Sequence, residues 1–228
     1  MTSSTIYPPL GSGCEYYSKL DKYISPDGFK FSPQSCMLIG DMEKHLNIDI
    51  PKVGCCKFND RNNVPIRLKK NGEPVKTQKE IIDGVNYEGV LVNFIGVKDY
   101  LWKKKDTEGI YFITLNGHIV KIGMTENSFC ERFCSYVCGC RRAMNKGSCS
   151  TTNFVICEVL YGALQLGLHV DIYGIQIPKE KKEINVYGQT CICPVSVVRA
   201  HEEIITNRYK NVIGILPPLC VQHASNTS

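Results

Sequence analysis

The stretch Gly109–Tyr136, GIYFITLNGHIVKIGMTENSFCERFCSY, decides how the rest of the chain is interpreted. Asn116-Gly117 stands between two runs rich in β-branched and aromatic residues, and this dipeptide between extended runs predicts a β-hairpin. Ser128 and Glu131 then match the S-x-x-E pattern of a capping box, which predicts a helix that begins near residue 128. We therefore expect a hairpin followed directly by a helix.

The length of the hairpin loop decides which side chains share a face of the sheet. A two-residue loop, residues 116–117, pairs Tyr111 with Ile122 and turns Lys121 to the other face. A three-residue loop, residues 115–117, pairs Tyr111 with Lys121 directly, and Gly117 supplies the left-handed position that such a loop needs. Both loops suit the sequence, but only the longer one brings Tyr111 and Lys121 together.

The predicted helix carries Arg132 and Tyr136, which are four residues apart and therefore lie together on its surface. An arginine near a helix N-terminus opposes the helix dipole, and an anion bound there would remove the conflict. Beside these two residues runs an apolar stripe at helical spacing, formed by Phe129, Cys130, Phe133, Cys134, Val137 and Cys138.

Taken in order, Gly109-Ile110-Tyr111, Lys121-Ile122-Gly123 with Thr125, then Arg132 and Tyr136, resemble the GIY-YIG nuclease superfamily. The resemblance covers about residues 107 to 213, and Lys121 stands where the first tyrosine of the second triplet usually lies. This variant is similar to a branch that contains certain restriction endonucleases and phage or large-virus proteins with a K-I-G-x-T sequence. In those restriction enzymes, as in this chain, Tyr, Lys, Arg and Tyr recur at offsets of ten, eleven and four.

The resemblance also implies a metal-binding carboxylate on a later helix, for which RAHEEIITNRY offers Glu202 and Glu203. Glu202 fits the family pattern slightly better because the apolar Ile205 follows it by three residues, and Glu203 stays the alternative. One divalent cation, Mg²⁺ or Mn²⁺, is implied as the cofactor, because such ions prefer oxygen ligands.

The same resemblance implies a role for each of the four aligned side chains. Tyr111 would be the general base, and Lys121 would favour its phenolate form. Arg132 would hold the phosphate through charge-assisted hydrogen bonds. Tyr136 would donate to a phosphate oxygen or orient the attacking water.

The chain as a whole predicts an α+β protein, with a small antiparallel sheet flanked by helices and a further mixed region before it. Residues 1–106 are expected to serve DNA binding or target recognition, residues 107–213 to form the nuclease-like domain, and residues 214–228 to be a loose tail. Residues 153–162 and 168–178 predict strands and residues 195–211 a helix. Residues 77–85 predict one or two helical turns.

A formal net charge of +5 and a pI of about 8.5 permit DNA as a partner. No run of about 18 apolar residues occurs and the first residues do not form a signal peptide, so we expect an intracellular protein of the cytoplasm or nucleus, not secreted and not in a membrane. Two basic clusters are candidates for phosphate contacts: Lys103, Lys104 and Lys105, and Arg141 and Arg142.

The thirteen cysteines are an odd number, which favours reduced thiols packed as small hydrophobic groups over a disulfide framework. Zinc is the weaker alternative, because neither Cys191 with Cys193 nor the group Cys138, Cys140 and Cys149 has C-x₂-C spacing.

The sequence thus favours a metal-dependent DNA endonuclease, acting as a homodimer or by sequential nicking. One alternative is a nucleic-acid-binding module that keeps the fold without the catalysis. Another is an interaction protein that uses its basic clusters, which predicts that Tyr111 and Lys121 lie on opposite faces of the hairpin.

Overall fold

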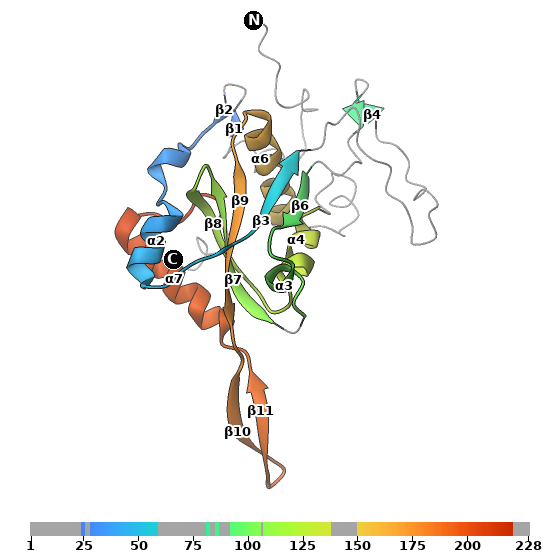
Figure 1. Ribbon diagram of the computed structural model, residues 1–228, viewed down its shortest axis with the longest axis vertical. Helices are drawn as coiled ribbons and strands as arrows, with labels where there is room; N and C mark the ends of the chain where they lie inside the picture. Colours follow the sequence, from blue (N-terminus) through green and yellow to red (C-terminus); the bar gives the residue numbers. More distant parts are fainter. Residues whose placement is uncertain are drawn as a thin grey trace, which may run out of the picture. The chain divides into compact units, whose positions relative to one another are not determined.

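The computed structural model of the protein describes residues 24–25, 28–58, 81–82, 85–86, 92–105, 107–137 and 150–220. Helices and strands both contribute, as Figure 1 shows, so the expected α+β class is confirmed. In chain order the elements are β1 (Ile24–Ser25), β2 (Gly28–Phe29), η1 (Pro33–Ser35), α2 (Ile39–Leu46), β3 (Lys52–Phe58), β4 (Ile81–Ile82), β5 (Val85–Asn86), β6 (Val92–Gly96), α3 (Asp99–Trp102), β7 (Glu108–Leu115), β8 (His118–Thr125), α4 (Phe129–Val137), α6 (Thr151–Gln165), β9 (Val170–Ile177), β10 (Glu180–Val186), β11 (Gln189–Val195) and α7 (Val198–Ile213).

The main sheet has five strands in the order β6-β3-β9-β7-β8. β3 runs antiparallel to β9, and β7 runs antiparallel to β8. β3 and β6 precede residue 107, so the sheet takes strands from both sides of the boundary that composition predicts. β10 and β11 pair with each other as a separate two-stranded hairpin between β9 and α7.

The chain divides into two compact units, each built from separate segments. The first unit comprises residues 1–32, 56–95 and 133–170, and the second comprises residues 33–55, 96–132 and 171–228. The second unit contains β7, β8 and α7, and with them every predicted catalytic residue except Tyr136. The division into residues 1–106, 107–213 and 214–228 stays a prediction.

The hydrophobic core of the second unit covers one face of β7 and β8. From the hairpin it takes alternate residues such as Ile110, Phe112 and Ile122, and from α2 and α7 it takes Met42 and Tyr209 among others. Figure 1 shows α2 and α7 on the same side of these strands. Because neighbouring side chains of a strand point to opposite faces, the residues between the core positions face the other way.

The local predictions made outside the hairpin and α4 are judged by element. The strand predicted at residues 168–178 is confirmed as β9, and the helix at 195–211 as α7. Residues 153–162 were expected to form a strand, and this is wrong: they belong to α6, whose first turn is capped by Ser150 through the amide of Asn153 at 3.2 Å. Most described side chains of α6 are buried, so its apolar run lacks the polar face by which a helix is recognised.

The helical turns predicted at residues 77–85 are wrong at residues 81, 82 and 85, and the rest of that range lies outside the described residues. Ile81 lies opposite Asn86 and Ile82 opposite Val85, so the described part consists of the antiparallel strands β4 and β5. The sequence contains a signal for this pairing, because Asp-Gly between Ile82 and Val85 is typical of a tight hairpin turn.

The cysteines within the described ranges are free thiols, and four of them are buried: Cys36, Cys56, Cys157 and Cys220. This agrees with the expected packing of reduced thiols as small hydrophobic groups. Among the helices that the structure describes, none combines the length and the apolar character needed to cross a bilayer.

Candidate active site

The β7–β8 hairpin closes through a two-residue turn, because Leu115 lies opposite His118. Asn116 and Gly117 have φ values of 48° and 83°, the left-handed conformation that asparagine and glycine tolerate best. The three-residue loop that would pair Tyr111 with Lys121 is therefore wrong.

A β-bulge after the turn changes the pairing of the two strands. Thr114 lies opposite Ile119, whereas Ile113 lies opposite Lys121, so Val120 is the additional residue on β8. The expected pairing of Tyr111 with Ile122 in a two-residue loop is consequently wrong as well. The bulge turns Lys121 to the face on which Ile113 lies.

Beyond the bulge, Tyr111 lies opposite Gly123 and is a diagonal neighbour of Lys121 on the same face. A Cβ atom at Gly123 would stand 2.3 Å from the Tyr111 hydroxyl, so only glycine leaves room for this ring. The side chains are almost fully buried, with 1% exposure for Tyr111 and 6% for Lys121. The interaction-protein alternative predicts opposite faces, and this prediction is wrong.

α4 begins where the sequence predicts. The Ser128 hydroxyl accepts a hydrogen bond from the amide of Glu131 at 3.2 Å, which is the N-cap half of the predicted capping box. The ring of Phe129 lies against Gly109 of β7 and Gly174 of β9, where an added Cβ would stand 2.7 Å from a ring carbon in each case. The two glycines thus hold the first turn of α4 close to the sheet.

Arg132 follows in this first turn and reaches Tyr111. Its Nε–H donates to the Tyr111 hydroxyl at 3.2 Å, and its guanidinium carbon lies 5.8 Å from the centre of the tyrosine ring. Lys121 forms no ion pair with any residue in the described ranges. A guanidinium and a buried ammonium therefore lie on the same face as one buried phenol, and an unpaired buried charge is costly unless an anion binds beside it.

Tyr136 lies one turn after Arg132 on α4 and belongs to the first unit. Its ring is fully buried and packs on Phe133 and Phe94, with ring centres 5.6 and 6.3 Å away. The predicted apolar stripe is correct at Phe133 but wrong at Cys134, which is exposed. The buried face of α4 includes Tyr136 instead.

Of the two carboxylates on α7, Glu202 is half-buried and Glu203 is exposed. Glu202 lies one turn before Thr206, a buried residue of the helix face that packs on the core. Burial raises the pKa of the Cys220 thiol, while Lys121 lowers this pKa and Glu202 raises it through their charges. Glu202 and Lys121 thus lie within electrostatic range of one buried thiol.

The first basic cluster, residues 103–105, lies on the surface, and two of its three lysines contact other side chains of the protein. Lys103 forms an exposed ion pair with Asp99 at 3.1 Å, and Lys104 donates to the side-chain oxygen of Gln176 at 3.2 Å. Lys105 is exposed. Arg141, Arg142 and Cys138 lie outside the described residues.

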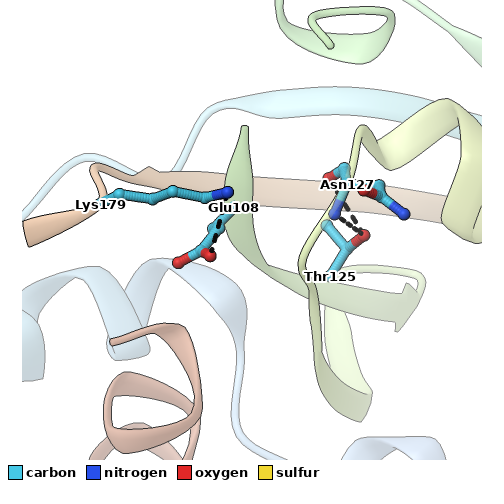
Figure 2. A network of polar contacts seen from close by, with 4 residues as sticks. All are labelled: Glu108, Thr125, Asn127 and Lys179. Carbon is cyan, nitrogen blue, oxygen red and sulfur yellow. Dashed lines mark hydrogen bonds and ion pairs between the residues drawn. The ribbon is translucent and has the colours of Figure 1, made fainter. Parts of the chain in front are cut away.

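Sequence reasoning missed Glu108, the residue immediately before Gly109. Its side chain is 1% exposed, and its Oε1 lies 3.8 Å from the ammonium of Lys179, where β9 continues into β10 (Figure 2). Its Oε2 is buried and has no hydrogen-bond partner among the residues that the structure describes. At the end of β8, the Thr125 hydroxyl donates to the carbonyl of Asn127 at 3.0 Å and accepts from the Asn127 amide at 3.2 Å (Figure 2). A charged residue at the start of an otherwise uncharged strand was the available signal.

Metal-binding groups are sparse in the described ranges, which contain no cluster of three or more His, Cys, Asp or Glu side chains able to hold an ion. Mg²⁺ differs from most protein-bound metals because one or two carboxylates suffice when water and phosphate oxygens complete its shell. A single half-buried carboxylate such as Glu202 fits an ion of this class whose other ligands come from a bound phosphate.

Comparisons with known proteins give structural neighbours only. No protein-family model matches the chain, and no curated protein sequence matches it. Among solved structures, the chain is similar to the restriction endonuclease HPY188I in complex with product DNA, with a TM-score of 0.49, 18% identity, and coverage of 95% of this chain and 99% of that one. It is also similar to a mutant of EndoII from bacteriophage T4, with a TM-score of 0.42, 16% identity, and coverage of 81% and 99%.

Proposed function

We propose that this protein is a metal-dependent endonuclease of the GIY-YIG type that hydrolyses phosphodiester bonds in DNA. One observation carries the proposal: the buried Tyr111 hydroxyl accepts a hydrogen bond from Arg132, and the buried ammonium of Lys121, which has no ion-pair partner within the described ranges, lies on the same face. A phosphodiester is an anion that a guanidinium and an ammonium placed in this way would bind.

The proposed reaction uses Tyr111 as the general base. Its phenolate takes a proton from a water molecule, the water oxygen bonds to phosphorus, and the bond from phosphorus to the leaving deoxyribose oxygen breaks. Lys121 stabilises the phenolate, and Arg132 stabilises the charge on the phosphate in the transition state. Tyr136 would donate to a phosphate oxygen or orient the water, as the resemblance implies.

Glu202 is the residue that would hold Mg²⁺ or Mn²⁺, and the exposed Glu203 is the less suitable carboxylate. The ion would supply positive charge that neutralises the leaving oxyanion. A half-buried carboxylate loses less side-chain freedom on binding an ion than an exposed one does, which favours Glu202.

DNA recognition in this proposal belongs to surface cations and to residues 1–106. Lys103, Lys104 and Lys105, together with Arg141 and Arg142, would contact phosphates and make binding weaken as salt increases. Cleavage of both strands would use a homodimer or two successive nicks by one chain.

The test is nicking of supercoiled plasmid with Mg²⁺ or Mn²⁺ and a chelator control. We expect the variants Tyr111→Phe and Arg132→Ala to lose on the order of 100-fold or more in rate, because each removes a group that acts in the transition state. Glu202→Gln and Glu203→Gln are a matched pair, with the same charge change on adjacent residues. Glu202→Gln should abolish metal-dependent nicking, and Glu203→Gln should leave it within about twofold.

Full activity of Tyr111→Phe would contradict the general-base role, and equal losses in both glutamate variants would contradict the choice of Glu202. If the wild-type protein cuts no plasmid, branched or single-stranded DNA but binds it, the protein is the binding module without catalysis.

A further inference from the structure

β8 is the outermost strand of the main sheet beside β7, and its outer edge is covered by two segments that are not strands of that sheet. Near the turn, the amide of Ile119 donates to the carbonyl of Met37 at 2.8 Å, and the amide of Ile39 donates to the carbonyl of Gly117 at 3.0 Å. An uncovered edge would expose these groups to water or to another strand.

Further along β8, residues 219 and 220 cover the edge on both sides of Lys121. The amide of Leu219 donates to the carbonyl of Val120, the bulge residue, at 2.9 Å. The Cys220 thiol accepts from the amide of Ile122 and donates to its carbonyl, both at 3.3 Å. Leu219 is fully buried and Cys220 is 3% exposed. Residues 219 and 220, which belong to the tail expected from the sequence, thus lie buried against β8.

We propose that Leu219 and Cys220 are positioning residues that hold Lys121 beside Tyr111; this inference rests on the proposed function of that site. The backbone of Lys121 is bounded by Val120 and Ile122, and each of these neighbours is held by a contact from this pair. A bulge leaves its additional residue without a partner in the ladder, so the contact from Leu219 supplies one. Loss of these contacts frees the segment whose conformation turns Lys121 toward Tyr111.

The chemistry of position 220 supports this role. One side chain there must both accept from an N–H and donate to a C=O of the same residue, which a neutral thiol or hydroxyl can do. Burial raises the pKa of the Cys220 thiol, so its proton is retained at neutral pH and the donor is preserved. Serine reproduces both bonds, whereas alanine and valine reproduce neither.

The experiment compares Cys220→Ala, Cys220→Val and Cys220→Ser in the full chain, with Cys36→Ala as the control. Cys36 is a buried thiol whose side-chain partners include Tyr209 and Ser35, so its replacement removes a buried thiol of the same kind from another place in the core. Two properties are measured: the rate of plasmid nicking, and the proximity of the Tyr111 ring to the Lys121 side chain, followed by NOEs between labelled tyrosine and lysine assigned with Tyr111→Phe. The second readout requires no catalysis.

We expect Cys220→Ala and Cys220→Val to weaken these NOEs, because the Lys121 side chain is no longer held near the phenol. Nicking at neutral pH should fall on the order of tenfold. Cys220→Ser should restore both. Cys36→Ala should lower thermal stability with no change in either.

Unchanged NOEs in both Cys220→Ala and Cys220→Val would overturn the positioning role, as would an equal weakening in Cys36→Ala. Cys220→Val keeps the buried volume, so it answers the question if Cys220→Ala does not fold. Weakened NOEs without nicking by the wild-type protein would refute the proposed nuclease and leave the positioning role intact.

Discussion

Two hairpins in the described part of the chain have nearly the same turn and opposite surroundings. The β7–β8 hairpin turns at Asn116-Gly117 with φ values of 48° and 83°, and the β10–β11 hairpin turns at Tyr187-Gly188 with φ values of 51° and 81°. Every residue of β7 is buried, whereas every residue of β10 is exposed. Figure 1 shows β10 and β11 extending away from the sheet as a separate pair.

The comparison separates what a turn determines from what the rest of the fold determines. The exposed hairpin keeps one register from the Val186–Gln189 pair to the Glu180–Val195 pair, as its turn alone would give. The buried hairpin departs from that simple register at its bulge. Contacts on both faces of the hairpin and on its outer edge stabilise a different position of Lys121. Turn chemistry starts both hairpins, and tertiary contacts shape only one.

The largest expected difference concerns isoleucines of the same chemistry in the two hairpins. Ile110 of β7 is fully buried in the core, and Ile192 of β11 is 67% exposed. Ile110→Ala should lower the free energy of unfolding by about 2–5 kcal/mol, because it leaves a cavity. Ile192→Ala should change it by less than about 0.5 kcal/mol. Urea unfolding measures both, and a loss above about 1 kcal/mol for Ile192→Ala would show that the exposed hairpin is covered by something in solution.

A smaller difference is expected from exchanging the first turn residues. Tyrosine at a left-handed position costs about 1–2 kcal/mol more than in an ordinary conformation, and asparagine tolerates it better. Asn116→Tyr should therefore destabilise the whole protein by about 1–2 kcal/mol in thermal unfolding.

In the exposed hairpin the reciprocal change Tyr187→Asn should slow local amide exchange in β10 and β11 and leave global unfolding nearly unchanged. Equal global effects of Asn116→Tyr and Tyr187→Asn, of either sign, would refute the idea that only the first hairpin is coupled to the core.

The smallest expected effect is a difference between a buried and an exposed tyrosine in how stability changes at alkaline pH. Burial raises the pKa of Tyr209, whose hydroxyl donates to the Ile119 carbonyl at 3.4 Å. The unfolded chain loses this proton near pH 10 while the folded protein keeps it, so stability falls as the pH rises above about 10. Tyr209→Phe should make that fall shallower by up to ~1.4 kcal/mol per pH unit.

The control is Tyr187→Phe, because the Tyr187 side chain is as exposed in the folded protein as in an unfolded chain. Unfolding measured at pH 9, 10 and 11 compares the slopes, so a constant loss of stability from the missing hydroxyl does not affect the result. Identical slopes for the wild-type protein and Tyr209→Phe would contradict the assignment.

Local signals in the sequence were sufficient to predict a feature where one residue type satisfies a local requirement of the backbone. Asn116-Gly117 predicts its turn and Ser128 its helix cap because each satisfies backbone groups within four residues of itself. The strand at β9 and the helix at α7 follow from periodicity. Tyr187-Gly188 went unnoticed because tyrosine is a poor residue for its position, so the turn lacks the usual signal.

Features that depend on distant residues could not be predicted in this way. The bulge residue Val120 is hydrogen-bonded by Leu219, about a hundred residues later in the chain. The requirement for glycine at position 123 arises only because the Tyr111 ring packs against it. The apolar run of α6 gave a strand prediction because the elements that bury it are elsewhere in the chain. The residues of the candidate site could therefore be named from the sequence, whereas the strand register that places them could not.

The cover on the edge of β8 has a consequence for synthesis of the protein. The chain between Tyr111 and Cys220 is 109 residues long (220−111), which a ribosome takes roughly 5–20 s to add. During that interval the nascent hairpin has neither Glu202 nor the edge contacts of Leu219 and Cys220. Under the proposed function, the emerging chain would not cut DNA until these last residues are added.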